Sequence, residues 1–180
     1  MVNLITAVLL ILFAAFSRLL PHPMNFAPVT AIALFAGVYL NKKYAFIVPI
    51  AAMILSDAFI GFYSYVYWVY GTILVIAVVG LWLRSRVKEG STGKKVAFIF
   101  GTTLASSVIF FLITNFGVWT SGMFYEMNFS GLMQSYAAAI PFFRNSLLGD
   151  LCYVTAMFGI YEIVKRFAGE SSLLESKVRK

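Results

Sequence analysis

Long apolar runs separated by short polar stretches dominate the chain. The runs cover about residues 3–20, 27–41, 44–62, 66–84, 95–117 and 134–166. A helix needs roughly 20 apolar residues to cross the hydrocarbon of a bilayer. The pattern therefore predicts six transmembrane helices, of which the second is the shortest. Because Pro21, Pro23 and Pro28 crowd its start, we expect irregular backbone there, covered by protein or lining a water-filled cavity.

Basic residues fall on alternate connections between these runs. Six helices would place all of the following on one side: Lys42, Lys43, Arg84, Arg86, Lys88, Lys94, Lys95, Lys165, Arg166, Lys177, Arg179 and Lys180. The opposite connections, at residues 21–27, 62–66 and 117–133, contain no lysine or arginine. The positive-inside rule then places both termini in the cytoplasm. We expect a six-helix transmembrane domain over residues 1–167 and a cytoplasmic tail over 168–180. A cleaved signal peptide is the alternative interpretation of the first run, but that run lacks a positively charged start.

Composition supports a membrane protein and limits the chemistry. Hydrophobic residues make up 61% of the chain and charged residues 12%, whereas soluble domains are about 25% charged. The net charge of +7 is not arranged as a basic stripe with aromatics, so we expect no nucleic acid partner. A single cysteine, Cys152, excludes an intrachain disulfide, and a single histidine, His22, argues against a metal site. We predict no cofactor.

Polar residues within the runs gather toward the side that lacks basic residues. At about 1.5 Å of rise per residue, Arg18 and Asn115 lie within about one turn of that surface, Asp57 about 8 Å in and Arg144 about 12 Å in. The similar depths of Asp57 and Arg144 predict a buried ion pair between the third and sixth helices. It is either structural or a pair that a ligand's charged group intercepts on binding.

Asp150 is the deepest of these residues, about 20 Å in. Hydroxyl groups on the fifth helix reach a comparable depth and could donate hydrogen bonds to it: Thr102, Thr103, Ser106 and Ser107. Asp150 is therefore either a satisfied structural carboxyl or a proton-coupling group. Asp57 and Asp150 differ by about 12 Å in depth, too far apart for an aspartyl protease dyad. No Gly-x-Ser-x-Gly elbow and no phosphate-binding glycine loop is present, so we do not expect an enzyme.

Aromatic residues flank the outer connections more densely than the inner ones. An interfacial aromatic belt explains many of them, but the asymmetry also favours a pocket for a flat ligand. In such a pocket Trp68 and Trp119 would stack on the ligand. Polar contacts would come from Arg18, Asn25, Asp57, Asn115, Arg144 and Asn145.

Four strings carry a resemblance to a known family. They are Arg18-Leu-Leu-Pro-His-Pro-Met-Asn-Phe-Ala-Pro28, Ile54-Leu-Ser-Asp57, Leu112-Ile-Thr-Asn-Phe-Gly-Val-Trp119 and Pro141-Phe-Phe-Arg-Asn-Ser-Leu-Leu-Gly-Asp150. The strings resemble an uncharacterised bacterial family of membrane proteins described as transport proteins. Size, helix number and polar outer connections more distantly resemble the S components of energy-coupling-factor (ECF) vitamin transporters.

The resemblance implies a multi-pass protein of the bacterial inner membrane that binds a vitamin or other micronutrient from outside. S components use a transmembrane energising subunit with ATPases, and dock through an Ala-x-x-x-Ala motif on the first helix. The corresponding positions here are Ala7, Ile11 and Ala15, with a bulky residue at the centre. The sequence is compatible both with a protein that docks on a shared energising module and with one that acts alone.

Our leading hypothesis is thus a substrate-binding transport protein for a small, flat, polar or anionic micronutrient. The alternative is a structural or assembly subunit without a ligand, and an intramembrane enzyme comes third. A cavity at the outer end of the bundle would favour the first hypothesis over the second.

Overall fold

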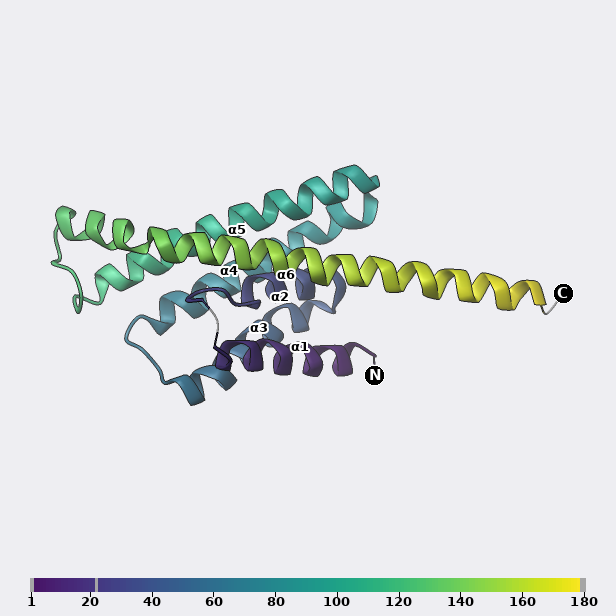
Figure 1. Cartoon of the computed structure of the whole chain (residues 1–180), viewed down its shortest axis with the longest axis horizontal. Helices are drawn as coiled ribbons and strands as arrows, with labels where there is room; N and C mark the ends of the chain where they lie inside the picture. Colours follow the sequence, from purple (N-terminus) through teal and green to yellow (C-terminus); the bar gives the residue numbers. More distant parts are fainter. Residues whose placement is uncertain (1, 22, 179–180) are drawn as a thin grey trace.

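The computed structural model describes residues 2–21 and 23–178, with side-chain surroundings given for 4–21 and 23–167. Within these residues the protein is all helical (Figure 1). The helices are α1 Val2–Leu19, α2 Val29–Tyr39, α3 Lys42–Ile60, α4 Val66–Glu89, α5 Thr92–Thr120 and α6 Phe129–Val178. All six apolar runs therefore correspond to helices.

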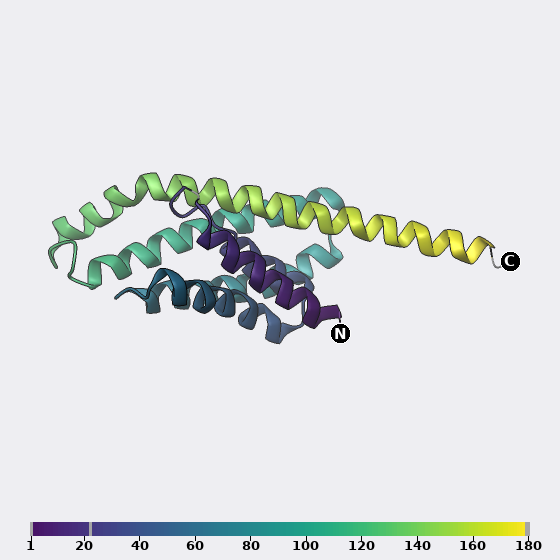
Figure 2. The same cartoon turned by 60° about the horizontal axis from the view of Figure 1, so that its bottom comes forward.

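The last helix is longer than its apolar run. α6 begins at Phe129 rather than at residue 134 and continues to Val178, so its helical backbone extends through most of the segment expected to be a separate tail. Asn128 sets its start, because the Asn128 Oδ1 accepts a hydrogen bond from the Gly131 N–H at 2.8 Å, as an N-cap side chain does. In both views α6 runs along the whole bundle and then beyond it (Figures 1 and 2).

The short helix α2 lies at the centre of the bundle. Its residues Val29 to Val38 are all buried, as expected for a helix that is apolar on every face. It packs closely against α4 at a glycine pair, since a Cβ added to Gly37 would lie 2.5 Å from the Gly80 carbonyl carbon. This close approach leaves no room for a side chain at Gly37.

The C-terminal end of α2 is held by an arginine from α4. Arg84 donates hydrogen bonds to the Gly37 carbonyl from Nε at 2.9 Å and from Nη2 at 2.7 Å, and it also contacts the Leu40 carbonyl. These carbonyls have no partner within the helix, and a cation there also interacts favourably with the helix dipole. Arg84 therefore has a structural role at this end.

Helix length and apolar composition are compatible with a multi-pass membrane protein. Among the described residues, four helices are long and apolar enough to cross a membrane: α3, α4, α5, and α6 as far as Phe167. Two shorter apolar helices, Leu4–Leu19 and Val29–Tyr39, accompany them. The outward faces carry exposed apolar side chains such as Phe16, Val78 and Ile160, which suit lipid better than water. α1 begins and α6 ends toward the same end of the bundle (Figure 1).

Candidate functional site

A cavity of about 690 Å³ lies at one end of the bundle. It is lined by residues of the three connections that contain no lysine or arginine, including Met24, Asn25, Tyr63, Tyr65, Phe124 and Tyr125. Residues from all six helices complete its walls. Its volume lies within the range of about 300–1,000 Å³ that is usual for small-molecule sites.

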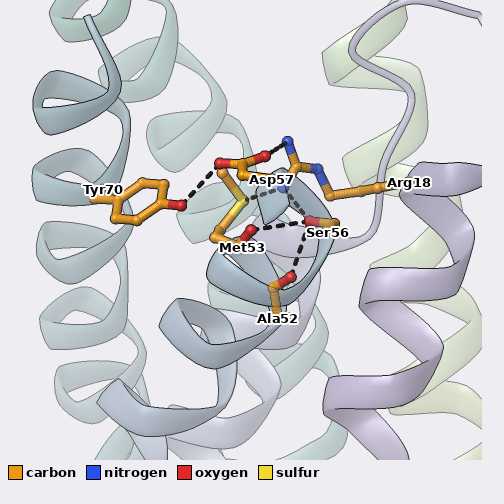
Figure 3. Close-up of polar contacts among 6 residues, drawn as sticks. All are labelled: Arg18, Ala52, Met53, Ser56, Asp57 and Tyr70. Carbon is orange, nitrogen blue, oxygen red and sulfur yellow. Dashed lines mark hydrogen bonds and ion pairs between the residues drawn. The ribbon is translucent and has the colours of Figure 1, made fainter. Parts of the chain in front are cut away.

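Arg18, in the last turn of α1, is the cationic side chain of the described cavity wall. Its guanidinium Nη2 lies 2.7 Å from the Oδ1 of Asp57 on α3. Nη1 donates to the Ser56 hydroxyl and to the Met53 Sδ, the latter at 3.0 Å. The Tyr70 hydroxyl on α4 donates to the other Asp57 oxygen at 2.8 Å. Figure 3 shows this network, which joins α1, α3 and α4.

The predicted ion pair between Asp57 and Arg144 is wrong. Asp57 is fully buried and paired with Arg18, whose side chain is 15% exposed, whereas Arg144 is exposed. Asp57 and Arg18 both lie in the last turn of their helices.

Asp150 is the deepest wall residue on α6, and it is 2% exposed. Its Oδ2 accepts a hydrogen bond from the Ser107 hydroxyl of α5 at 2.7 Å. Ser107 is one of the four hydroxyl residues on this helix that the sequence offered as partners. The Thr30 side chain, in the first turn of α2, is a second partner. The adjacent Gly149 packs against Phe26, since a Cβ there would lie 3.2 Å from the Phe26 Cα. Asp150 therefore lies beside the N-terminus of α2.

A patch of small polar groups lies between α5 and α6. The Asn115 Nδ2 donates to the Phe111 carbonyl at 2.7 Å, and the Ser135 hydroxyl donates to the Asn115 carbonyl at 2.9 Å. Both residues line the cavity, as does Thr114. The amide oxygen of Asn115 is an acceptor that this side chain can offer to a bound molecule.

Aromatic side chains from the connections cover the cavity. Tyr63 and Tyr65, between α3 and α4, have ring centroids 4.7 Å apart. Burial, followed by the negative charge of Asp57, raises the pKa of the Tyr63 phenol above its usual range, so this hydroxyl stays protonated. Asn25 adopts a φ of 63°, a left-handed conformation that asparagine tolerates better than most residues.

The structure brings some of the predicted site residues together and separates others. Arg18, Asn25 and Asn115 line the cavity, and Asp57 contacts Arg18 beside it. The described lining residues do not include Trp68, Trp119, Arg144 or Asn145. His22 lies outside the described residues.

The two tryptophans have packing partners instead. Trp68 lies against Gly117, where an added Cβ would come within 2.4 Å of its ring, and its ring contacts Phe116 edge-on. The Trp119 Nε1 donates to the Glu126 carbonyl at 3.0 Å. Trp119 therefore stabilises the α5–α6 connection, and Trp68 fixes α4 against α5.

Sequence reasoning missed a stripe of wall residues on α6, most of which are small or polar. Ser135, Ala139, Phe142 and Ser146 line the cavity, and Asp150 continues the same face. Their spacing of three or four residues is the helical period. This periodicity, within a run that is otherwise apolar, was the signal that could have found them.

The fold and site define a class: an all-helical protein with an apolar exterior and a partly polar cavity at one end. Residues 1–172 match the model of a family described as "Family of unknown function (DUF6580)", and the chain belongs to this family. Comparisons with curated proteins and with solved structures give no match.

Proposed function

We propose that this protein is a substrate-binding membrane transport protein of the S-component type. Six transmembrane helices would cross the bacterial inner membrane with both termini in the cytoplasm. The cavity would take up a small, vitamin-like or other micronutrient from outside. The observation that supports this most directly is the cavity itself, because a subunit that only locks helices together needs no space of this size between them.

The distribution of basic residues supports an outward-facing cavity. Lys42 and Lys43 begin α3, and Arg86 and Lys88 lie in the last turn of α4. These positions are at the end opposite the connections that cover the cavity. Under the positive-inside rule that end faces the cytoplasm, so the cavity faces outward.

A transmembrane energising subunit with ATPases remains part of the proposal, but α1 does not offer the usual docking motif for it. Ala7 and Ala15 are 2% and 3% exposed, and Ala7 packs in a cluster with Ile32 and Ala52 of α2 and α3. Such a partner would have to bind another surface, or the protein acts alone.

Native mass spectrometry of the detergent-purified chain tests the proposal. We expect the wild-type protein to retain a small molecule. Two neighbouring exposed alanines on α6 provide matched variants: Ala138 lines the cavity, whereas Ala137 is not among the described lining residues. Ala138→Trp should fill the cavity and release the molecule, whereas Ala137→Trp should retain it.

A wild-type protein that retains no molecule, and that gains no thermal stability from any fraction of a cell extract, would favour the structural alternative. Retention of the same molecule by both tryptophan variants would place binding elsewhere. Equal melting temperatures of the two variants without ligand would show that Ala138→Trp acts on binding rather than on folding.

A further inference from the structure

The two features of the cavity that could attract an anion already have carboxyl partners. The Arg18 guanidinium is paired with the fully buried Asp57. The N-terminus of α2 carries a partial positive charge and would otherwise favour an anion. Asp150 lies beside that N-terminus, where the Thr30 side chain is one of its partners. An anionic ligand would therefore compete with two internal carboxyl groups.

Asp150 is an ionisable residue of the cavity wall that has no described ion-pair partner. Arg18 and Asp57 neutralise each other, and within the described residues Arg18 is the only lysine or arginine of the wall. Asp150 has hydroxyl partners but no described basic residue within ion-pair distance. A carboxylate can accept about four hydrogen bonds, so Ser107 and Thr30 leave it capacity for a donor from a ligand. An ionisable residue in a bundle interior is by default a functional-site hypothesis, and a cationic ligand would supply the counter-ion that favours the charged form of Asp150.

The apolar part of the wall also suits a cation. Phe110, Phe111, Phe142 and Phe143 line the cavity near the α5–α6 interface, and the rings of Phe111 and Phe143 are 4.8 Å apart. Tyr63 and Tyr125 add aromatic surface from the connections. Aromatic faces attract organic cations, more strongly when water is excluded.

We propose that the cavity binds a flat organic cation, such as a protonated amine or amidinium group on a ring, with Asp150 as its counter-ion. This inference rests on the proposed substrate-binding function, and it replaces the expected preference for an anion. Arg18 and the Asn115 amide then act on the polar, uncharged part of the same ligand. Asp150 is the residue that makes the cavity prefer a cationic ligand over a neutral or an anionic one.

Three probes of matched shape and different charge test the inference: benzamidine, benzamide and benzoate. Their affinities for the purified full chain are measured by isothermal titration calorimetry in detergent. We expect benzamidine to bind at least about tenfold more tightly than benzamide, because a charge-assisted hydrogen bond exceeds a neutral one by about that factor. Benzoate should bind most weakly.

Asp150→Asn should reduce benzamidine affinity to that of benzamide while leaving benzamide affinity unchanged, a split that a merely structural role would not produce. The control is Glu126→Gln, the same acid-to-amide change at an exposed position outside the described wall. It should bind all three probes as the wild type does.

Equal affinities for benzamidine and benzamide, tighter binding of benzoate, or no saturable benzamidine binding would each overturn the inference. The proposed function is decided separately by native mass spectrometry. A retained molecule that is neutral or anionic would keep the function and overturn the cation preference alone. The absence of any retained molecule or probe binding would overturn both.

Discussion

Replacing Asp57 by asparagine should strongly destabilise the fold. The asparagine oxygen can still accept from the Tyr70 hydroxyl, so the main loss is the charge that neutralises Arg18. Asp57 is fully buried, and only 15% of the Arg18 side chain is exposed, so water compensates little. Removing one partner of a buried pair costs about 3–5 kcal/mol. The retained Tyr70 contact places our expectation at the lower end, at about 3 kcal/mol.

The assay is thermal unfolding in detergent. A loss of about 3 kcal/mol corresponds to roughly 6–12 °C for a chain of this length. Arg144→Gln provides a matched control because Arg144 is an exposed arginine on α6, and surface substitutions usually change stability by less than about 0.5 kcal/mol. Arg18→Gln and the double variant Asp57→Asn/Arg18→Gln complete a cycle. The double variant should lose less stability than the two single variants added together, because it leaves no unpaired charge.

Two results would refute this reasoning. Equal melting shifts for Asp57→Asn and Arg144→Gln would show that burial of the pair does not determine its contribution. Strictly additive effects of the Asp57 and Arg18 substitutions would show that the two groups do not interact energetically, despite the 2.7 Å between their atoms.

Two further predictions concern helix packing and topology. Gly37→Ala should lower the free energy of unfolding by about 1–3 kcal/mol through overpacking, because the added Cβ would meet Gly80. The control is Gly101→Ala, whose Cβ would have nothing within 4 Å, so this variant should melt at or above the wild-type temperature. Equal shifts of the two melting temperatures in detergent would contradict the close contact of α2 and α4. In a Cys152→Ser background, Ser64→Cys should react with a membrane-impermeant maleimide on intact cells, and Ser91→Cys only after permeabilisation; the reverse pattern would invert the proposed orientation.

The existence of the six helices could be predicted from the sequence because each corresponds to a long apolar run. Three predicted site residues, Arg18, Asn25 and Asn115, line the cavity because they belong to helix ends or connections on the side without basic residues. Position along the chain determines at which end a residue lies. This information is sufficient to predict cavity-lining residues that lie close to a connection, because few other environments are within reach of their side chains.

The partner of Asp57 could not be predicted in the same way. Helical rise gives a depth, but the direction of a side chain depends on the rotation of its helix, which packing sets. Helical rise predicted for Arg144 a depth similar to that of Asp57, but α6 begins at Phe129 rather than at residue 134, and Arg144 is exposed. The polar stripe on α6 was missed for a related reason. The face that contains Ser135 and Asp150 points into the bundle, while neighbouring residues on the same helix point outward.

The cavity follows from the shortness of α2. With 11 residues, α2 is about 16 Å long, roughly half the thickness of the hydrocarbon layer. Pro28 opposes an earlier start of the helix, since it disfavours helical backbone in Ala27, the residue that precedes it. A longer α2 would occupy the space into which Asn25 and Thr30 now project as wall residues. The irregular segment at the start of the second apolar run therefore leaves the space for a ligand, and it places the N-terminus of α2 beside Asp150.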